Sequence, residues 1–219
     1  MDIVKILKQH NIMVNPFLIN PTNENYDKTK YQIQKYKTSK VMDALNFAEE
    51  FHGEQKRKYT YEKYIFHPIE VMRIVSITKH DENMLMAALL HDTVEDTDAT
   101  LLDIQKYFGD DVRNLVSDLT DISKPSDGNR LIRKTLDRDH SANSSSRAKT
   151  IKYADLISNT KSIVSHDKNF AKMYLKEKAA LLNVMNNGDI LLKNIATDIL
   201  IASQKIIFEH EKHDKNISR

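Results

Sequence analysis

An adjacent histidine and aspartate, His91 and Asp92, end an apolar segment at residues 84–90. Imidazole and carboxylate groups bind metal ions, and charge without a partner is costly in such apolar surroundings. Glu95 follows His91 by four residues, which returns it to the same helix face one turn later, and Asp96 comes next. Read alone, the segment has two interpretations: a metal-binding cluster, or a cation at a helix C-terminus beside solvated acids.

Two more segments favour the metal-binding interpretation. His67 directly precedes Pro68, where we expect a helix to begin. Asp155 interrupts the apolar pattern of residues 151–157, and Asn159 follows one helical turn later on the same face. A lone acid on a helix usually faces solvent, whereas an acid among apolar neighbours needs a partner.

Four segments together resemble the hydrolase domain of the Rel/Spo alarmone family, a branch of the HD superfamily. They are residues 55–58 (QKRK), 64–68 (YIFHP), 87–97 (AALLHDTVEDT) and 152–155 (KYAD). Their order and approximate spacing agree with that family over about residues 39 to 200. The resemblance is strongest to stand-alone small alarmone hydrolases, which remove the 3′-pyrophosphate from hyperphosphorylated guanosine nucleotides.

The resemblance implies a role for each matching residue. The metal ligands that it implies are His67, His91, Asp92 and Asp155. The acids that act on the attacking water would be Glu95 and Asp96, and the substrate contacts would be Arg57, Lys58, Asn159 and Ser162. Two imidazoles and two carboxylates suit manganese, iron or zinc better than calcium, and the resemblance favours Mn²⁺. A bound divalent ion lowers the pKa of its water from 15.7 toward about 7.

The sequence departs from the family pattern beside the basic pair. Tyr59-Thr60-Tyr61 replaces a small Ser/Gly turn, and the loop from there to His67 is one residue longer. Arg57 therefore also has an interpretation as a solvated loop charge. The charged helix expected at residues 130–139 is a candidate for holding 5′-phosphates, although the sequence provides no geometry for it.

We expect a metal-dependent 3′-pyrophosphohydrolase that acts on (p)ppGpp-type nucleotides. One alternative keeps the fold and metal but changes the substrate to (p)ppApp, to NADPH or to a deoxynucleoside monophosphate. Another alternative is a non-catalytic nucleotide-binding or antitoxin-like protein. The complete set of ligands and acids argues against loss of activity.

The elements that position these groups are all expected to be helices. The 219 residues include only four Gly and four Pro, too few for a turn-rich sandwich or barrel. Apolar periodicity predicts helices at about residues 39–51, 68–78, 82–91, 100–108, 110–122, 130–139, 147–165, 169–186 and 189–210. The fold class is therefore all-α, with an HD-type domain at 37–210, an N-terminal extension at 1–36 and a flexible tail at 211–219.

Composition limits the partners and the compartment. The absence of cysteine excludes disulfides, thiolate zinc sites and cysteine nucleophiles. The 33 basic and 31 acidic residues are interspersed and leave a net charge of +2, so we expect no nucleic-acid binding. No apolar run is long enough to span a bilayer, and residues 1–8 lack a signal-peptide core. We expect a cytoplasmic protein with a small nucleotide substrate and no membrane partner, and the oligomeric state stays open.

Overall fold

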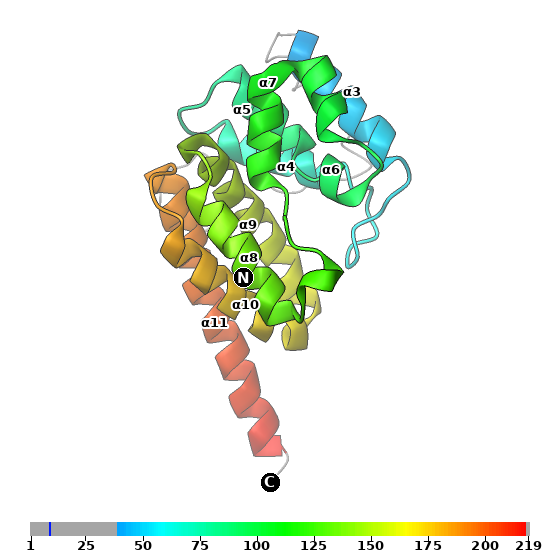
Figure 1. Ribbon diagram of the computed structural model, residues 1–219. Coiled ribbons are helices and arrows are strands. Elements are labelled where there is room, and N and C mark those ends of the chain that lie inside the picture. Colours follow the sequence, from blue (N-terminus) through cyan, green and yellow to red (C-terminus); the bar gives the residue numbers. More distant parts are fainter. Residues whose placement is uncertain (1–8, 10–38, 218–219) are drawn as a thin grey trace.

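The computed structural model (Figure 1) describes residue 9 and residues 39–217. The N-terminal extension expected at residues 1–36 lies outside the described residues, apart from residue 9. Within the described part, the regular elements are helices, and the one β-like pairing is an isolated bridge between Lys56 and Lys63. The all-α prediction is confirmed.

The long helices are numbered as in Figure 1. They are α3 (Ser39–His52), α4 (Phe66–Val75), α5 (Glu82–Leu90), α7 (Leu101–Leu119), α8 (Arg130–Asn143), α9 (Ser146–His166), α10 (Lys168–Val184) and α11 (Ile190–Ile217). Two short elements join them: α6 (Thr93–Asp96) and a 3-10 turn at Pro125–Asp127. None of the described helices is long and apolar enough to cross a membrane.

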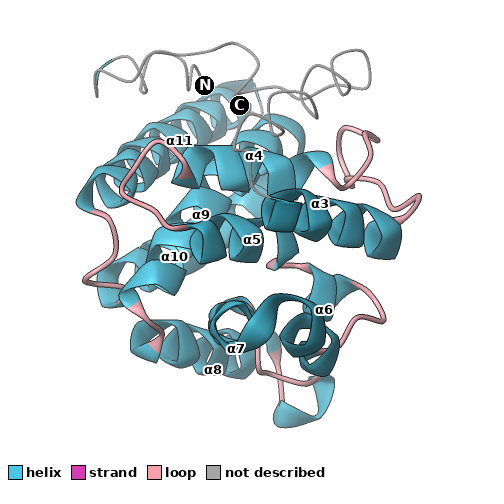
Figure 2. Ribbon diagram, turned by 90° about the horizontal axis from the view of Figure 1, so that it is seen from above, coloured by secondary structure: helices cyan, strands magenta, loops and turns pink. Residues whose placement is uncertain are grey.

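Helices α5 and α9 form the centre of the molecule (Figure 2). Helix α9 packs against α4, α5, α7, α10 and α11, and α5 also contacts α3, α4 and α7. Residues 84–90 of α5 are all buried, which explains why this helix has no polar face. Because α5 and α9 have little access to solvent, the polar groups that they carry at the site face neighbouring helices rather than bulk water.

Local signals set most helix boundaries. The carboxylate of Asp81 accepts a hydrogen bond from the Met84 amide, and this N-cap starts α5. Thr100 and Asp103 form a reciprocal capping box at the start of α7. Gly109 has a φ of 86° inside α7, so the expected break between two helices appears as a kink.

Three boundaries differ from the sequence predictions. Helix α4 begins at Phe66, before Pro68, so His67 lies in its first turn. Helix α8 continues to Asn143, four residues beyond the expected end at residue 139. Helix α11 continues to Ile217, beyond the start of the expected tail, because apolar periodicity defines only the part of a helix that packs on the core.

Candidate metal centre and nucleotide pockets

Four candidate ligands converge from three parts of the chain. His67 comes from the first turn of α4, His91 and Asp92 from the junction between α5 and α6, and Asp155 from α9. Nε2 of His67 lies 3.4 Å from Oδ2 of Asp92 and 3.2 Å from Oδ1 of Asp155. Nε2 of His91 lies 3.1 Å and 3.9 Å from the same two oxygens.

The two imidazole rings are oriented by bonds on their far sides. Nδ1 of His67 is 2.9 Å from the Ser158 hydroxyl, which itself donates to Glu70 at 2.8 Å, so the histidine must donate to the serine. Nδ1 of His91 donates to the carbonyl of Ala88 at 2.9 Å. In neutral imidazoles this leaves both Nε2 atoms unprotonated and facing the carboxylates.

The donor set fits a divalent cation. Both Nε2 atoms are buried and have no hydrogen-bond partner among the residues that the structure describes, and an orphaned buried nitrogen is rare unless something else satisfies it. His67, His91 and Asp92 offer ligand atoms within 4.8 Å of one another. Asp155 adds the second carboxylate, as its oxygen lies between the two histidines.

Electrostatics keep the two carboxylates ionised. Burial alone would raise the pKa of Asp155, but Lys152, 3.3 Å away, and both histidines hold it well below its usual range. Burial is likewise outweighed at Asp92, whose pKa is lowered mainly by His91 and His67. Burial would lower the pKa of His67, yet the two neighbouring aspartates, which favour its protonated form, raise it to about 9. A cation must therefore displace a proton to bind there.

Several positioning residues were not found by sequence reasoning. The Tyr64 hydroxyl donates to Oδ2 of Asp92 at 2.6 Å. Asn159 was predicted from the sequence as a substrate contact, but its bond to Asp155, in which the amide donates to Oδ1 at 2.6 Å, was not. Tyr64 lies within a quoted motif, but its type alone does not reveal a bond to a residue 28 positions away. No sequence pattern pointed to Ser158 and Glu70 as site residues, because their roles depend on how α4 packs against α9.

The two candidate acids follow the ligands on α6 and are exposed to solvent. Glu95 accepts a hydrogen bond from the Asp121 amide at 3.3 Å. Partial burial and the negative charge of Asp121 raise the pKa of Glu95 to about 7. The pKa of Asp96 is also raised, by partial burial first and then by repulsion from Asp92. Glu95 is therefore able to exchange a proton near neutral pH.

The candidate substrate residues meet on one side of the metal site. Arg57 lies 3.4 Å from the Asn159 amide oxygen and 3.5 Å from the Ser162 hydroxyl, across about one hundred residues of sequence. These residues and Lys58 line a pocket of about 160 Å³ that also includes His67. Tyr59, from the unusual loop, lines the same pocket.

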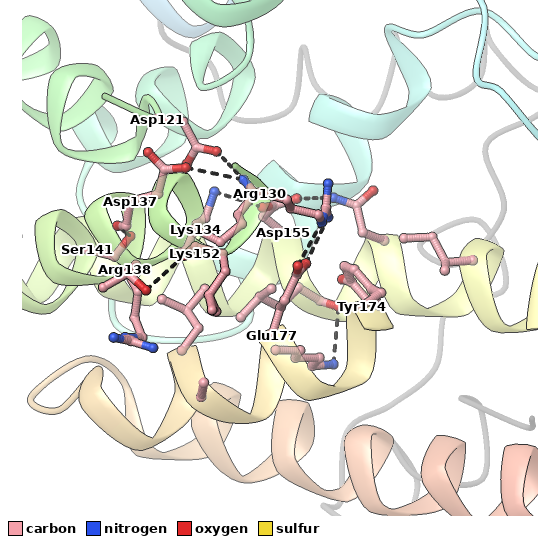
Figure 3. Close-up of a pocket in the computed structure, with 18 of the residues that line it drawn as sticks. Asp121, Arg130, Lys134, Asp137, Arg138, Ser141, Lys152, Asp155, Tyr174 and Glu177 are labelled. Atoms are coloured by element: carbon pink, nitrogen blue, oxygen red, sulfur yellow. Dashed lines mark hydrogen bonds and ion pairs between the residues drawn. The ribbon is translucent and has the colours of Figure 1, made fainter. Parts of the chain in front are cut away.

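A larger pocket of about 330 Å³ (Figure 3) also has Asn159 in its lining. Asp155 forms part of its wall, so the pocket adjoins the metal site. Its lining includes the cationic side chains Arg130, Lys134, Arg138 and Lys152, and also Lys178, whose pKa burial lowers to about 7. Three of them come from α8, the charged helix for which the sequence provided no geometry.

Comparisons with known proteins agree with this geometry. The family described as "HD domain" matches residues 44–167. Guanosine-3′,5′-bis(diphosphate) 3′-pyrophosphohydrolase MESH1 from Drosophila melanogaster is 43% identical over 131 residues, which cover 58% of this chain and 72% of that protein. The Homo sapiens protein of the same description is 41% identical over 130 residues, covering 57% and 70%.

A solved structure shares the fold. It is described as a metazoan ortholog of SpoT that hydrolyses ppGpp, and it matches with a TM-score of 0.69 and 33% identity, covering 75% of this chain and 96% of that one. The resemblance found in the four sequence segments is thereby confirmed. The chain belongs to the HD-domain family, within its group of Rel/Spo-type hydrolase domains.

Proposed function

We propose that this protein is a metal-dependent 3′-pyrophosphohydrolase of (p)ppGpp-type nucleotides. The observation that carries the proposal is the convergence of two unpartnered imidazole nitrogens and two ionised carboxylates between two pockets of different character. Relatives more than 40% identical are named for this reaction.

His67, His91, Asp92 and Asp155 would hold the cation, for which we propose Mn²⁺, with iron or zinc as alternatives. The cation would supply positive charge at the scissile phosphate and make the attacking water more acidic. Nitrogen and oxygen donors in equal number suit these three metals. In the neutral form of each imidazole, the hydrogen bond at Nδ1 keeps the proton on that nitrogen and leaves Nε2 free to bind the cation.

The nucleotide would lie across Asn159, which lines both pockets. Base and ribose would occupy the smaller pocket beside Arg57, Lys58 and Ser162. The 5′-phosphates would enter the larger pocket, whose cations match their charge. This orientation presents the 3′-group to the metal site.

Glu95 and Asp96 would act on the attacking water. Ionised Glu95 would accept a proton from the water while the water oxygen attacks the phosphorus that is bonded to the ribose 3′-oxygen. The bond between that phosphorus and the 3′-oxygen breaks, so pyrophosphate is released intact, and the 3′-oxygen takes up a proton and stays on GDP as a hydroxyl group. A pKa of about 7 allows Glu95 to take up the proton and release it again near neutral pH.

Product analysis tests the proposal directly. The purified protein loaded with Mn²⁺ should convert ppGpp to GDP and pyrophosphate. Inorganic phosphate as the sole product would refute cleavage at the 3′-position, and faster cleavage of ppApp would refute the guanine preference. Inclusion of NADPH in the panel tests the phosphatase alternative, and failure to cleave any nucleotide would favour a binding protein.

A further inference from the structure

An acidic residue lies across the larger pocket from its basic helix. Arg130 is in the first turn of α8, and Glu177 is on α10. Nε and a terminal nitrogen of Arg130 each lie 2.8 Å from a different oxygen of Glu177 (Figure 3). This two-bond geometry is the one with which arginine binds a phosphate group.

The other carboxylates that line the pocket have different tasks. Asp155 belongs to the metal site. Asp137 accepts hydrogen bonds from the amides of Ile122 and Ser123, which holds the loop before α8, and it shares Lys134 with Asp121. Glu177 makes neither kind of contact: its hydrogen bonds among the described residues are those with Arg130.

Arg130 is also held in place by an aromatic ring. Its guanidinium carbon lies 5.6 Å from the centroid of Phe170, and Nζ of Lys58 lies 5.8 Å from the same centroid. Phe170 therefore contacts one basic group from each of the two pockets. This contact is independent of Glu177, so we expect Arg130 to stay in the pocket when its carboxylate partner is released.

We propose that Glu177 is a positioning residue that acts through Arg130 as an internal competitor for the 5′-diphosphate. The inference rests on the proposed function in one respect, the identity of the anion that enters the larger pocket. A diphosphate that binds Arg130 must displace the Glu177 carboxylate and then lie close to that negative charge. Glu177 thus weakens diphosphate binding and favours the release of a product that keeps its 5′-phosphates.

The test compares GDP with guanosine, because the two differ only in the diphosphate. In Glu177→Gln the pair with Arg130 loses its charge, and we expect the dissociation constant for GDP to fall about fivefold by isothermal titration calorimetry. The affinity for guanosine should not change. With ppGpp as substrate, KM should fall by a similar factor while kcat does not rise, a division that a general structural effect would not produce.

Two further variants serve as controls. Asp111→Asn breaks a comparable arginine pair, with Arg147, outside both pockets, and should leave GDP affinity unchanged. In an Arg130→Gln background, Glu177→Gln should lose most of its effect on GDP binding, because the competition is for Arg130.

The outcomes separate this inference from the proposed function. Weaker or unchanged GDP binding in Glu177→Gln would overturn the inference. Weaker binding would show that Glu177 supports Arg130 instead of competing for it. An equal gain for guanosine and GDP would also overturn it. If the wild-type protein did not hydrolyse ppGpp, the proposed function would fail, while the comparison of GDP with guanosine would still decide the role of Glu177.

Discussion

Ser158 offers the sharpest test of how the metal site is built. Its hydroxyl accepts from Nδ1 of His67 and donates to Glu70, at 2.9 Å and 2.8 Å, and all three residues are buried. Ser158→Ala removes the acceptor and leaves space too small for a well-bound water. The imidazole proton then has a better partner on the other side of the ring, at Nε2, where two carboxylates lie within 3.4 Å.

The expected loss follows from these contacts. A buried donor left without a partner costs about 1–3 kcal/mol, and removal of a hydrogen-bond partner behind a metal-binding histidine weakens metal binding about 10- to 100-fold. The two figures agree, since each factor of ten corresponds to about 1.4 kcal/mol. We expect Ser158→Ala to lower the affinity for the metal, because the four ligands themselves are unchanged.

The assay is a Mn²⁺ titration of protein stripped with a chelator, followed by thermal unfolding and by turnover at saturating Mn²⁺. Ser158→Ala should bind Mn²⁺ about 10- to 100-fold more weakly and recover most of its kcat in excess metal. Ser76→Ala is a matched control, because that hydroxyl bonds the Arg73 carbonyl at the other end of α4. Unchanged Mn²⁺ affinity in Ser158→Ala would refute the assignment of the His67 tautomer.

Three more predictions concern the site itself. Asp155→Ala should lose metal and activity together, as measured by metal analysis and turnover, and full occupancy in this variant would remove Asp155 from the ligand set. Glu95→Gln should keep its metal and lose at least 100-fold in kcat, whereas a metal-free Glu95→Gln protein would make Glu95 a ligand. The rate should rise with pH as Glu95 ionises, around its raised pKa of about 7. Asp121→Asn removes a negative charge that raises this pKa, so the acidic limb of the kcat/KM profile should move to lower pH, and a shift to higher pH would contradict the role of Glu95 as base.

Local sequence was sufficient for the helical class and for the residue types of the site. Few glycines and prolines, persistent helical periodicity and caps such as Asp81 act over a few residues, so they can be read from the chain alone. The pairing of His91 with Asp92 is also local. The division into an extension, a domain and a tail remains a prediction, and so do the cytoplasmic location and the lack of a nucleic-acid partner.

The residues that contact the metal ligands and the substrate residues from neighbouring helices were decided by tertiary packing. His67 and Ser158 are 91 residues apart, and Arg57 and Ser162 are 105 apart. Their contacts exist because α9 lies against α4 and beside the loop that precedes it. Sequence spacing reports neighbours within one helix and contains no information on which face of another helix will cover them.

The sequence by itself indicated that His67, His91, Asp92 and Asp155 could serve one site, because the short motifs around them resemble a known family and their types are those of metal ligands. Only the tertiary structure decided which imidazole nitrogen faces the metal and where the nucleotide can lie. Charge patterning marked α8 as basic but did not place Glu177 against it. Hydrogen bonds and ion pairs act over about 3 Å, so they depend on the docking of helices, which is a property of the whole core.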